Sequence, residues 1–215
     1  MENMKTKSNL ADLDTYVFID VSNIRYACLR SCNIRLSFPK LIKYFEGKYK
    51  HLRSVKYFEG ISDNDQDREK QFKNYKKLGY EIHSLSRKAY TDPAVYKEFN
   101  CKKCKTPNRV KVLEKSKKLK SNVDVYIASE LLKTALLATK PAHIILMSCD
   151  GDYAEMIKVA VENKNIHITV LATPMVSKNN CLSIRLKQLS KELPPAQYKL
   201  RDITEIKDEV SQNRA

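Results

Sequence analysis

The stretch His143-Ile144-Ile145-Leu146-Met147 is the most apolar segment of the chain, and it leads directly into Ser148-Cys149-Asp150-Gly151-Asp152. A short apolar run that stops at polar turn residues is typical of a strand buried on both faces of a parallel sheet. Tyr16-Val17-Phe18-Ile19 has the same form and ends at Asp20. The sequence therefore predicts two buried strands, each followed by a carboxylate.

Further segments alternate between strand and helix patterns along the chain. Strands are predicted at 55–58, 80–85 and 166–171, and helices from Ser37 to Gly47 and at 63–78, 123–138 and 154–161. This alternation with short turns predicts an α/β fold: a doubly wound, mainly parallel sheet of the Rossmann-like type. Ligand sites in such sheets lie beyond the carboxyl ends of the strands, where Asp20, Asp150 and Asp152 fall.

The 215 residues are enough for one α/β domain, which we expect at residues 14–195 with an insertion at 87–120. The charged tail at 196–215 is expected to be frayed. No apolar run approaches the ~18 residues that span a membrane, and the chain starts with a polar segment. Six cysteines are too sparse for a disulfide scaffold. We therefore expect a cytoplasmic protein with no membrane partner.

The Lys-rich insertion carries Cys101 and Cys104 between the strand-like runs 95–99 and 109–113. This pattern predicts a hairpin-like insertion with the cysteines at its tip. The Cys-x-x-Cys spacing supplies half of a structural Zn²⁺ site, because zinc usually takes four ligands. Cys28 and Cys32 could complete the site if the insertion folds back, or a second copy of the chain could lend its own pair in a homodimer. The alternative for Cys28 and Cys32 is a pair of ordinary, partly buried thiols.

The positive charge of the chain indicates a class of partner. Forty Lys and Arg against 25 Asp and Glu give a net charge of +15, a field that attracts polyanions such as nucleic acid. Solubility alone is an equal explanation for a basic protein. Residues 97–120 hold ten Lys or Arg and two Glu and lead directly to Asp124, so we expect this run to guide a nucleic-acid backbone. Tyr90, Tyr96 and Phe99 could stack on bases, or pack within the hairpin.

Four aspartates form the candidate site: Asp20, Asp150 and Asp152 follow strands, and Asp124 lies in the first turn of a predicted helix. Like charges held together raise one another's pKa and cost stability, and a divalent cation relieves this conflict. Oxygen ligands favour Mg²⁺ or Mn²⁺, and two such ions about 4 Å apart can promote phosphodiester hydrolysis. Each aspartate also has a structural explanation on its own, as a helix cap, a helix-dipole partner or a turn residue.

Three blocks of the sequence resemble the motifs of the NYN domain family, which belongs to the PIN-like nuclease superfamily. They are Phe18 to Asn23, Lys120 to Glu130 and Ser148 to Tyr153, in the family's order, and the resemblance spans about residues 16 to 172. It implies a metal-dependent ribonuclease acting on RNA, with Asp20, Asp124, Asp150 and Asp152 as catalytic metal ligands. Asn23 and Ser148 would orient the metal-bound water or a ligand carboxylate. Lys120, with the neighbouring Lys117 and Lys118, would bind substrate phosphate.

Three positions depart from the family pattern. Glu130 stands where Asp is common, and Val21 and Cys149 stand where Gly is common. The longer side chain of Glu130 can still reach a metal, so its supporting role stays open. A catalytically weak RNA-binding or regulatory module on the same fold is the alternative function. A phosphohydrolase of small esters is disfavoured, because Ser22 stands where aspartyl-phosphate enzymes carry a second Asp and the chain has no Gly-rich nucleotide loop.

Overall fold

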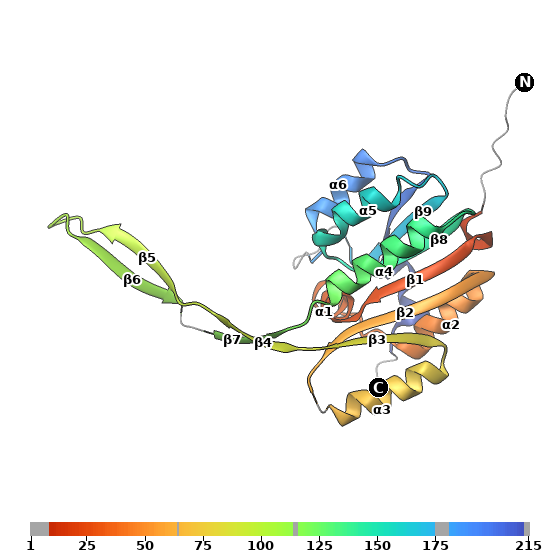
Figure 1. The fold of residues 1–215 in the computed structure, drawn as a ribbon, viewed down its shortest axis with the longest axis horizontal. Helices are drawn as coiled ribbons and strands as arrows, with labels where there is room; N and C mark the ends of the chain where they lie inside the picture. The colour runs from red at the N-terminus through yellow and green to blue at the C-terminus, as the bar shows by residue number, and fades with distance from the viewer. Residues whose placement is uncertain (1–8, 64, 114–115, 175–180, 213–215) are drawn as a thin grey trace, which may run out of the picture.

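The computed structural model describes residues 9–63, 65–113, 116–174 and 181–212. A six-stranded, all-parallel sheet in the order β3-β2-β1-β8-β9-β10 forms its centre (Figure 1). These strands are β1 (Asp14–Asp20), β2 (His51–Ile61), β3 (Tyr80–Ser86), β8 (Ala142–Met147), β9 (Ile166–Ala172) and β10 (Tyr198–Asp202). The order reverses direction between β1 and β8, as in a doubly wound sheet, so the predicted fold class is confirmed.

Helices cover the sheet as separate layers (Figure 1). They are α1 (Val21–Cys32), α2 (Phe38–Lys48), α3 (Gln66–Lys77), α4 (Val123–Leu137), α5 (Ala154–Ala160), α6 (Ile184–Glu192) and α7 (Lys207–Val210), with short 3-10 turns at η1 (Leu10–Asp12), η2 (Gly151–Tyr153) and η3 (Ile203–Ile206). Ser37 caps α2 through its side chain, and α4 buries Val123, Ile127, Leu131 and Ala135 at intervals of four, as their spacing predicts. No helix in these described ranges is long and apolar enough to cross a membrane.

A long two-stranded ribbon leaves the body after β3 and returns at the start of α4 (Figure 1). Its base pairs β4 (Lys88–Asp92) with β7 (Ser116–Lys120), and its outer part pairs β5 (Val95–Asn100) with β6 (Pro107–Leu113), both antiparallel. Cys101 and Cys104 lie in the turn between β5 and β6, at the far end of the ribbon. The base of the ribbon is therefore anchored at the carboxyl edge of the sheet.

The expectation of a frayed tail from residue 196 is wrong as far as residue 212. Tyr198–Asp202 is the edge strand β10, which pairs with β9 in parallel register. The Tyr198 ring is buried, and its hydroxyl donates to the Leu186 carbonyl at 2.9 Å. Val210 in α7 is buried as well. The charged sequence concealed the strand because only a few apolar side chains anchor it, while Lys199 between them is exposed.

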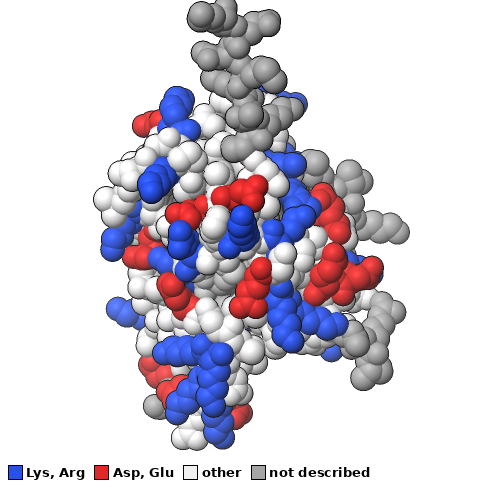
Figure 2. All heavy atoms as spheres, turned by 90° about the vertical axis from the view of Figure 1, so that its right-hand side faces the viewer, with Lys and Arg blue, Asp and Glu red and all other residues white. Residues whose placement is uncertain are grey.

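The end of the molecule opposite the ribbon carries charges of both signs (Figure 2). Acidic and basic side chains are interspersed over most of this face, and one group of basic side chains lies toward its lower end. Of the ten Lys and Arg of residues 97–120, the nine that the structure describes belong instead to the ribbon.

Candidate active site

Asp20 is the buried centre of the site, as the last residue of β1 and the N-cap of α1. Its Oδ1 accepts from the Asn23 backbone N–H at 3.3 Å, and its Oδ2 accepts from the hydroxyls of Ser148 at 3.3 Å and Tyr153 at 3.1 Å. Burial raises the pKa of Asp20 to about 6 against these hydrogen bonds, and the negative charge of Asp150 adds to the rise. Three hydrogen-bond donors thus fix the position of the Asp20 carboxylate, although burial disfavours its charged form.

The loop after β8 is tied to the start of α1. Asn23 Oδ1 accepts from the Cys149 N–H at 2.8 Å, and the Ser148 hydroxyl accepts from the Asp150 N–H at 3.2 Å. Asp150 in turn caps the following turn by accepting from the Asp152 N–H at 3.0 Å. Asn23 and Ser148 therefore hold the backbone that carries Asp20 and Asp150.

A pocket of about 310 Å³ opens at this edge of the sheet. Three of the four predicted carboxylates, Asp20, Asp124 and Asp150, line it together with Lys120. The rest of its wall consists of Ser22, Asn23, Gly60, Ser121, Asn122 and Val123. The pocket thus joins the ends of β1 and β2, the loop after β8, and the junction between the ribbon and α4.

Sequence reasoning missed Gly60, which lets the ribbon junction approach the sheet. A Cβ atom built on Gly60 would lie 2.0 Å from Oγ and 2.9 Å from Cβ of Ser121. Any larger residue at position 60 would push Ser121, and with it the start of α4, away from β2. A single Gly near the end of a strand pattern was the available signal, since it marks close backbone approach.

Two of the other predicted residues have partners outside this pocket. Glu130 pairs with Lys56 of β2, with 2.7 Å between Oε2 and Nζ. The Asp152 side chain is 79% exposed, and its Oδ1 lies 3.8 Å from Nη1 of Arg185. Neither residue lines the pocket. Within the described ranges, no three His, Cys, Asp or Glu side chains converge closely enough to hold one ion.

Of the two lysines predicted beside Lys120, Lys118 is exposed on β7. The side chain of Lys117 lies outside the described residues.

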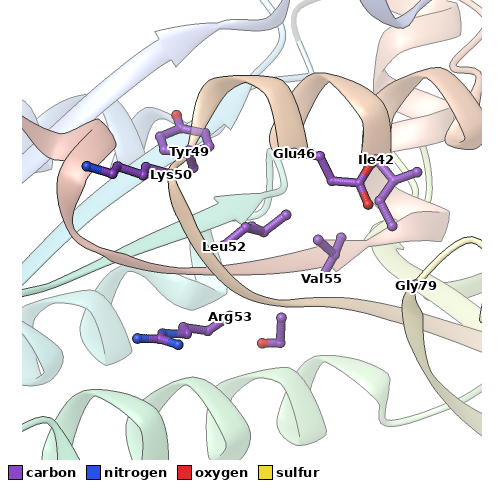
Figure 3. A pocket seen from close by; sticks show the side chains of 9 residues that line it. Ile42, Glu46, Tyr49, Lys50, Leu52, Arg53, Val55 and Gly79 are labelled. Carbon is purple, nitrogen blue, oxygen red and sulfur yellow. The ribbon is translucent and has the colours of Figure 1, made fainter.

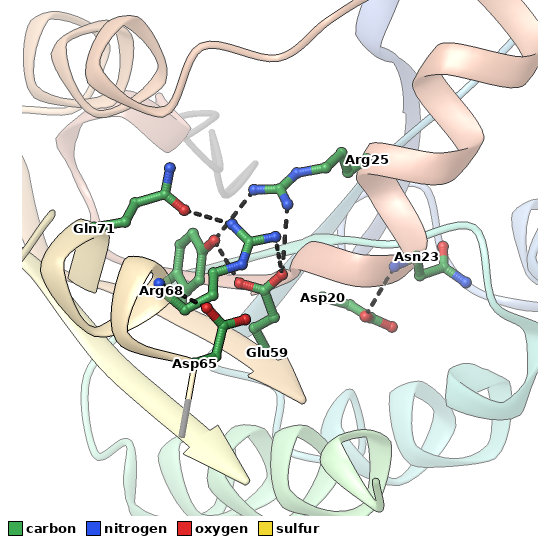
Figure 4. A network of polar contacts seen from close by, with 8 residues as sticks. Asp20, Asn23, Arg25, Glu59, Asp65, Arg68 and Gln71 are labelled. Atoms are coloured by element: carbon green, nitrogen blue, oxygen red, sulfur yellow. Dashed lines mark hydrogen bonds and ion pairs between the residues drawn. The ribbon is translucent and has the colours of Figure 1, made fainter. Parts of the chain in front are cut away.

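A polar network borders the pocket at the end of β2 (Figure 4). The buried Glu59 carboxylate accepts from the Tyr57 hydroxyl at 2.9 Å and pairs with Arg25 at 3.4 Å and Arg68 at 3.2 Å. Burial, followed by the charge of Glu59, raises the pKa of Tyr57, so this phenol stays protonated. Two guanidinium groups thus face one buried carboxylate beside Asp20.

The six cysteines fall into separate places. Cys28 is buried in α1, and the Cys32 thiol donates to the Cys28 carbonyl at 3.2 Å. Cys101 and Cys104 lie at the far end of the ribbon (Figure 1), so the ribbon does not fold back onto α1. Hydrogen bonds from Thr106 lower the pKa of Cys104 to about 7. Completion of a zinc site by Cys28 and Cys32 is therefore wrong for this structure, which favours the ordinary-thiol alternative for that pair.

A second hollow of about 290 Å³ lies at the amino edge of the sheet, between the end of α2 and the start of β2 (Figure 3). Its walls are Ile42, Glu46, Tyr49, Lys50, Leu52, Arg53, Ser54, Val55 and Gly79. None of the predicted site residues is among them. Ligand sites of parallel sheets lie at the carboxyl edge, which favours the pocket around Asp20.

Residues 14–185 match the model of the NYN domain. The chain belongs to the NYN domain family. This is a family of PIN-like nucleases, and the six-stranded parallel sheet with flanking helices is the fold that the resemblance implied.

One solved structure supports the fold alone. A protein of unknown function from Vibrio parahaemolyticus is similar to this NYN domain with a TM-score of 0.56 and 16% sequence identity, over 95% of this chain and 99% of that chain. No curated protein gives a significant match to the sequence.

Proposed function

We propose that this NYN domain is a ribonuclease that hydrolyses RNA phosphodiester bonds with Mg²⁺ or Mn²⁺. The observation that carries the proposal is that Asp20, Asp124, Asp150 and Lys120 line one pocket at the carboxyl edge of the sheet. Asp152 belongs to the proposal as a fourth ligand, which would exchange its 3.8 Å contact with Arg185 for the metal.

The side chains of the pocket fit a hard divalent cation. Asp20, Asp124 and Asp150 offer carboxylate oxygens, and Ser22 and Asn122 offer hydroxyl and amide oxygens, with no thiol or imidazole among the lining residues. Burial, which contributes most, and the charge of Asp150 raise the pKa of Asp20. A bound cation would stabilise this carboxylate in its charged form. When bound, the metal would supply Lewis acidity and activate water for attack on phosphorus.

The protein's own residues hold the carboxylates and the substrate. Ser148 and Tyr153 donate to one oxygen of Asp20, and the Asn23 N–H donates to the other, so this side chain is fixed before any ligand arrives. Lys120 lines the pocket and would bind a phosphate oxygen as a point charge. These contacts pre-organise the site, which is where much of the catalytic gain of enzymes arises.

The base of the ribbon supports a single-stranded nucleic acid as the substrate. Lys88 is paired with Lys120, and Tyr90 with Lys118, across the β4–β7 ladder. Cross-strand partners share a face, and residues two apart share it too, so these four side chains form one track that ends at the pocket. Lysines along such a track can contact the phosphates of a single-stranded nucleic acid, and an aromatic ring beside them can stack on a base.

A catalytically weak RNA-binding module is the second candidate function. The Lys56–Glu130 ion pair favours it. Glu130 stands where the family commonly has Asp, and here its carboxylate binds Lys56 and does not line the pocket. This module would keep the basic track and bind RNA without cutting it.

Cleavage of a labelled single-stranded RNA tests the proposal. Wild type, Asp150→Asn and the surface control Asp67→Asn would each be assayed with Mn²⁺, with Mg²⁺ and with EDTA. Metal-dependent cutting that Asp150→Asn abolishes and Asp67→Asn retains is the expected result. Binding of several RNAs by the wild type with no cutting of any would establish the binding module instead.

A further inference from the structure

The tip of the ribbon holds two thiols in a tight turn. The Cys101 N–H donates to the Thr106 carbonyl and the Lys105 N–H donates to the Cys101 carbonyl, both at 2.9 Å. Lys105, directly after Cys104, has φ 57°, a left-handed conformation that non-glycine residues rarely adopt. Such turns point successive backbone N–H groups into a concavity that suits anionic sulfur. The turn therefore presents Cys101 and Cys104 as a preformed pair.

One chain cannot complete a zinc site around this pair. Structural zinc takes four ligands, and residues 87–120 contain no further Cys and no His. The other four cysteines, Cys28, Cys32, Cys149 and Cys181, belong to the body of the protein, away from the ribbon tip (Figure 1). A site built from Cys and His alone therefore takes its other two ligands from outside the chain.

One face of the outer ribbon carries four exposed apolar side chains, together with Lys97 and Asn108. Val95, Phe99, Val110 and Leu113 are between 45% and 61% exposed. Alternate residues of a strand lie on one face, so Val95, Lys97 and Phe99 lie on this face. Their cross-strand partners Leu113, Val110 and Asn108 lie on it as well. A two-stranded ribbon without a second layer is marginally stable in water, so a covering surface would stabilise it.

The opposite face of the outer ribbon is polar and internally paired. The Arg109 guanidinium lies over the Tyr96 ring, 4.1 Å from its centroid, and 3.8 Å from the Glu98 carboxylate. The four exposed apolar side chains therefore gather on one face, and this is the face that a covering surface would stabilise.

We propose that two copies of the chain pack ribbon against ribbon through this apolar face, and that their tips share one Zn²⁺ held by Cys101 and Cys104 of each copy. A two-fold axis along the ribbons makes the contact self-complementary and brings both tips to the same end. Each thiol loses its proton to solvent as it becomes a zinc ligand.

The charges around the tip make the assembly depend on the metal. Lys102, Lys103 and Lys105 surround each cysteine pair, so two bare tips repel each other. Four thiolates on one Zn²⁺ carry a net charge of −2, which the six lysines of the two copies offset. Zinc binding thus lowers the net charge of the two tips from +6 to +4, the metal–thiolate bonds hold the tips together, and removal of zinc returns the chain to a monomer.

Metal analysis and light-scattering mass measurements of the full chain, with and without a zinc chelator, test the proposal. We expect a dimer with one zinc per two chains, which becomes a monomer when the chelator removes the metal. Cys101→Ser/Cys104→Ser would be a zinc-free monomer, and the control Cys32→Ser, in α1, would behave as the wild type. A monomer with or without zinc, or a dimer that survives the chelator, would overturn the proposal.

Two further measurements separate the parts of the proposal. Phe99→Ser would raise the dissociation constant of the zinc-loaded dimer by roughly tenfold or more, because Phe99 lies on the shared face. A dimer dissociated by a thiol reductant and unaffected by the chelator would indicate a disulfide and reject the zinc site. None of these readouts involves RNA, so they decide the dimer whether or not the domain is a nuclease.

Discussion

The Nζ atom of Lys56 lies 2.7 Å from Oε2 of Glu130, across the contact between β2 and α4. Both side chains are largely buried, and Lys56 also lies over the Phe18 ring, 5.3 Å from its centroid. The hydrogen bond from Lys56 lowers the pKa of Glu130, so this carboxylate stays charged at neutral pH. Glu130 follows Asp124 by six residues, which places it about 120° around the axis of α4. Asp124 therefore lies at the pocket, and Glu130 lies against β2 of the sheet.

Glu130→Gln should leave RNA cleavage unchanged and lower the free energy of unfolding by about 1 kcal/mol, because it removes one partner of a partly buried ion pair. Cleavage rates and urea unfolding would be measured on the same preparation. A loss of metal-dependent cleavage at unchanged stability would instead assign Glu130 a direct role in the site.

Gly60→Ala should destabilise the protein by about 1 to 3 kcal/mol and reduce cleavage, because the new Cβ would collide with Ser121. Since both close contacts are to the Ser121 side chain, adding Ser121→Gly should restore much of the loss. Thermal unfolding and cleavage of the two single variants and the double variant would show this coupling. Purely additive effects would mean that the contact between the two residues is unimportant.

His143 should make the protein less stable in mild acid. Burial, with the charges of His167 and Arg201, lowers the pKa of His143 to about 4. Between pH 6.5, the ordinary pKa of histidine, and pH 4, His143 is protonated in the unfolded chain and neutral in the folded chain. The free energy of unfolding therefore decreases as the pH falls. The decrease from pH 7.5 to pH 5 is about 2 kcal/mol.

Urea unfolding of wild type and His143→Gln at both pH values isolates this effect, because the other titrating groups are common to the two proteins. The variant should lose less stability than the wild type between the two pH values. Equal losses would show that His143 accepts a proton in the folded state. The Thr169 hydroxyl, 2.8 Å from Nε2, would then be a partner of the charged ring.

The sequence predicts the parts of this fold in which pattern and burial coincide. The apolar runs before Asp20 and Asp150 are buried strands at the centre of the sheet, and the four-residue spacing in α4 gives its buried face. Strand β10 escapes prediction because an edge strand buries few side chains. Its position depends on the pairing with β9, a contact that no local pattern encodes.

The same distinction applies to the candidate site. Asp20 and Asp150 follow from strand ends, since the carboxyl ends of parallel strands meet at one edge. Contacts between distant segments could not be predicted: the Tyr153 hydroxyl on Asp20, Ser121 against Gly60, and Lys56 on Glu130. Each depends on side-chain positions that are set only when the sheet and α4 pack together.

Lys88→Gln combined with Lys118→Gln should weaken RNA binding, because both side chains share the track that ends at Lys120. For single-stranded RNA, the slope of log affinity against log salt should decrease by about 0.7 for each phosphate that the protein no longer neutralises. The exposed Lys140, near the start of β8 at the amino edge, supplies the control Lys140→Gln. Binding isotherms at several salt concentrations measure all three proteins. If the control reduced the slope as much as the double variant, attraction by the overall positive charge would replace the track as the explanation.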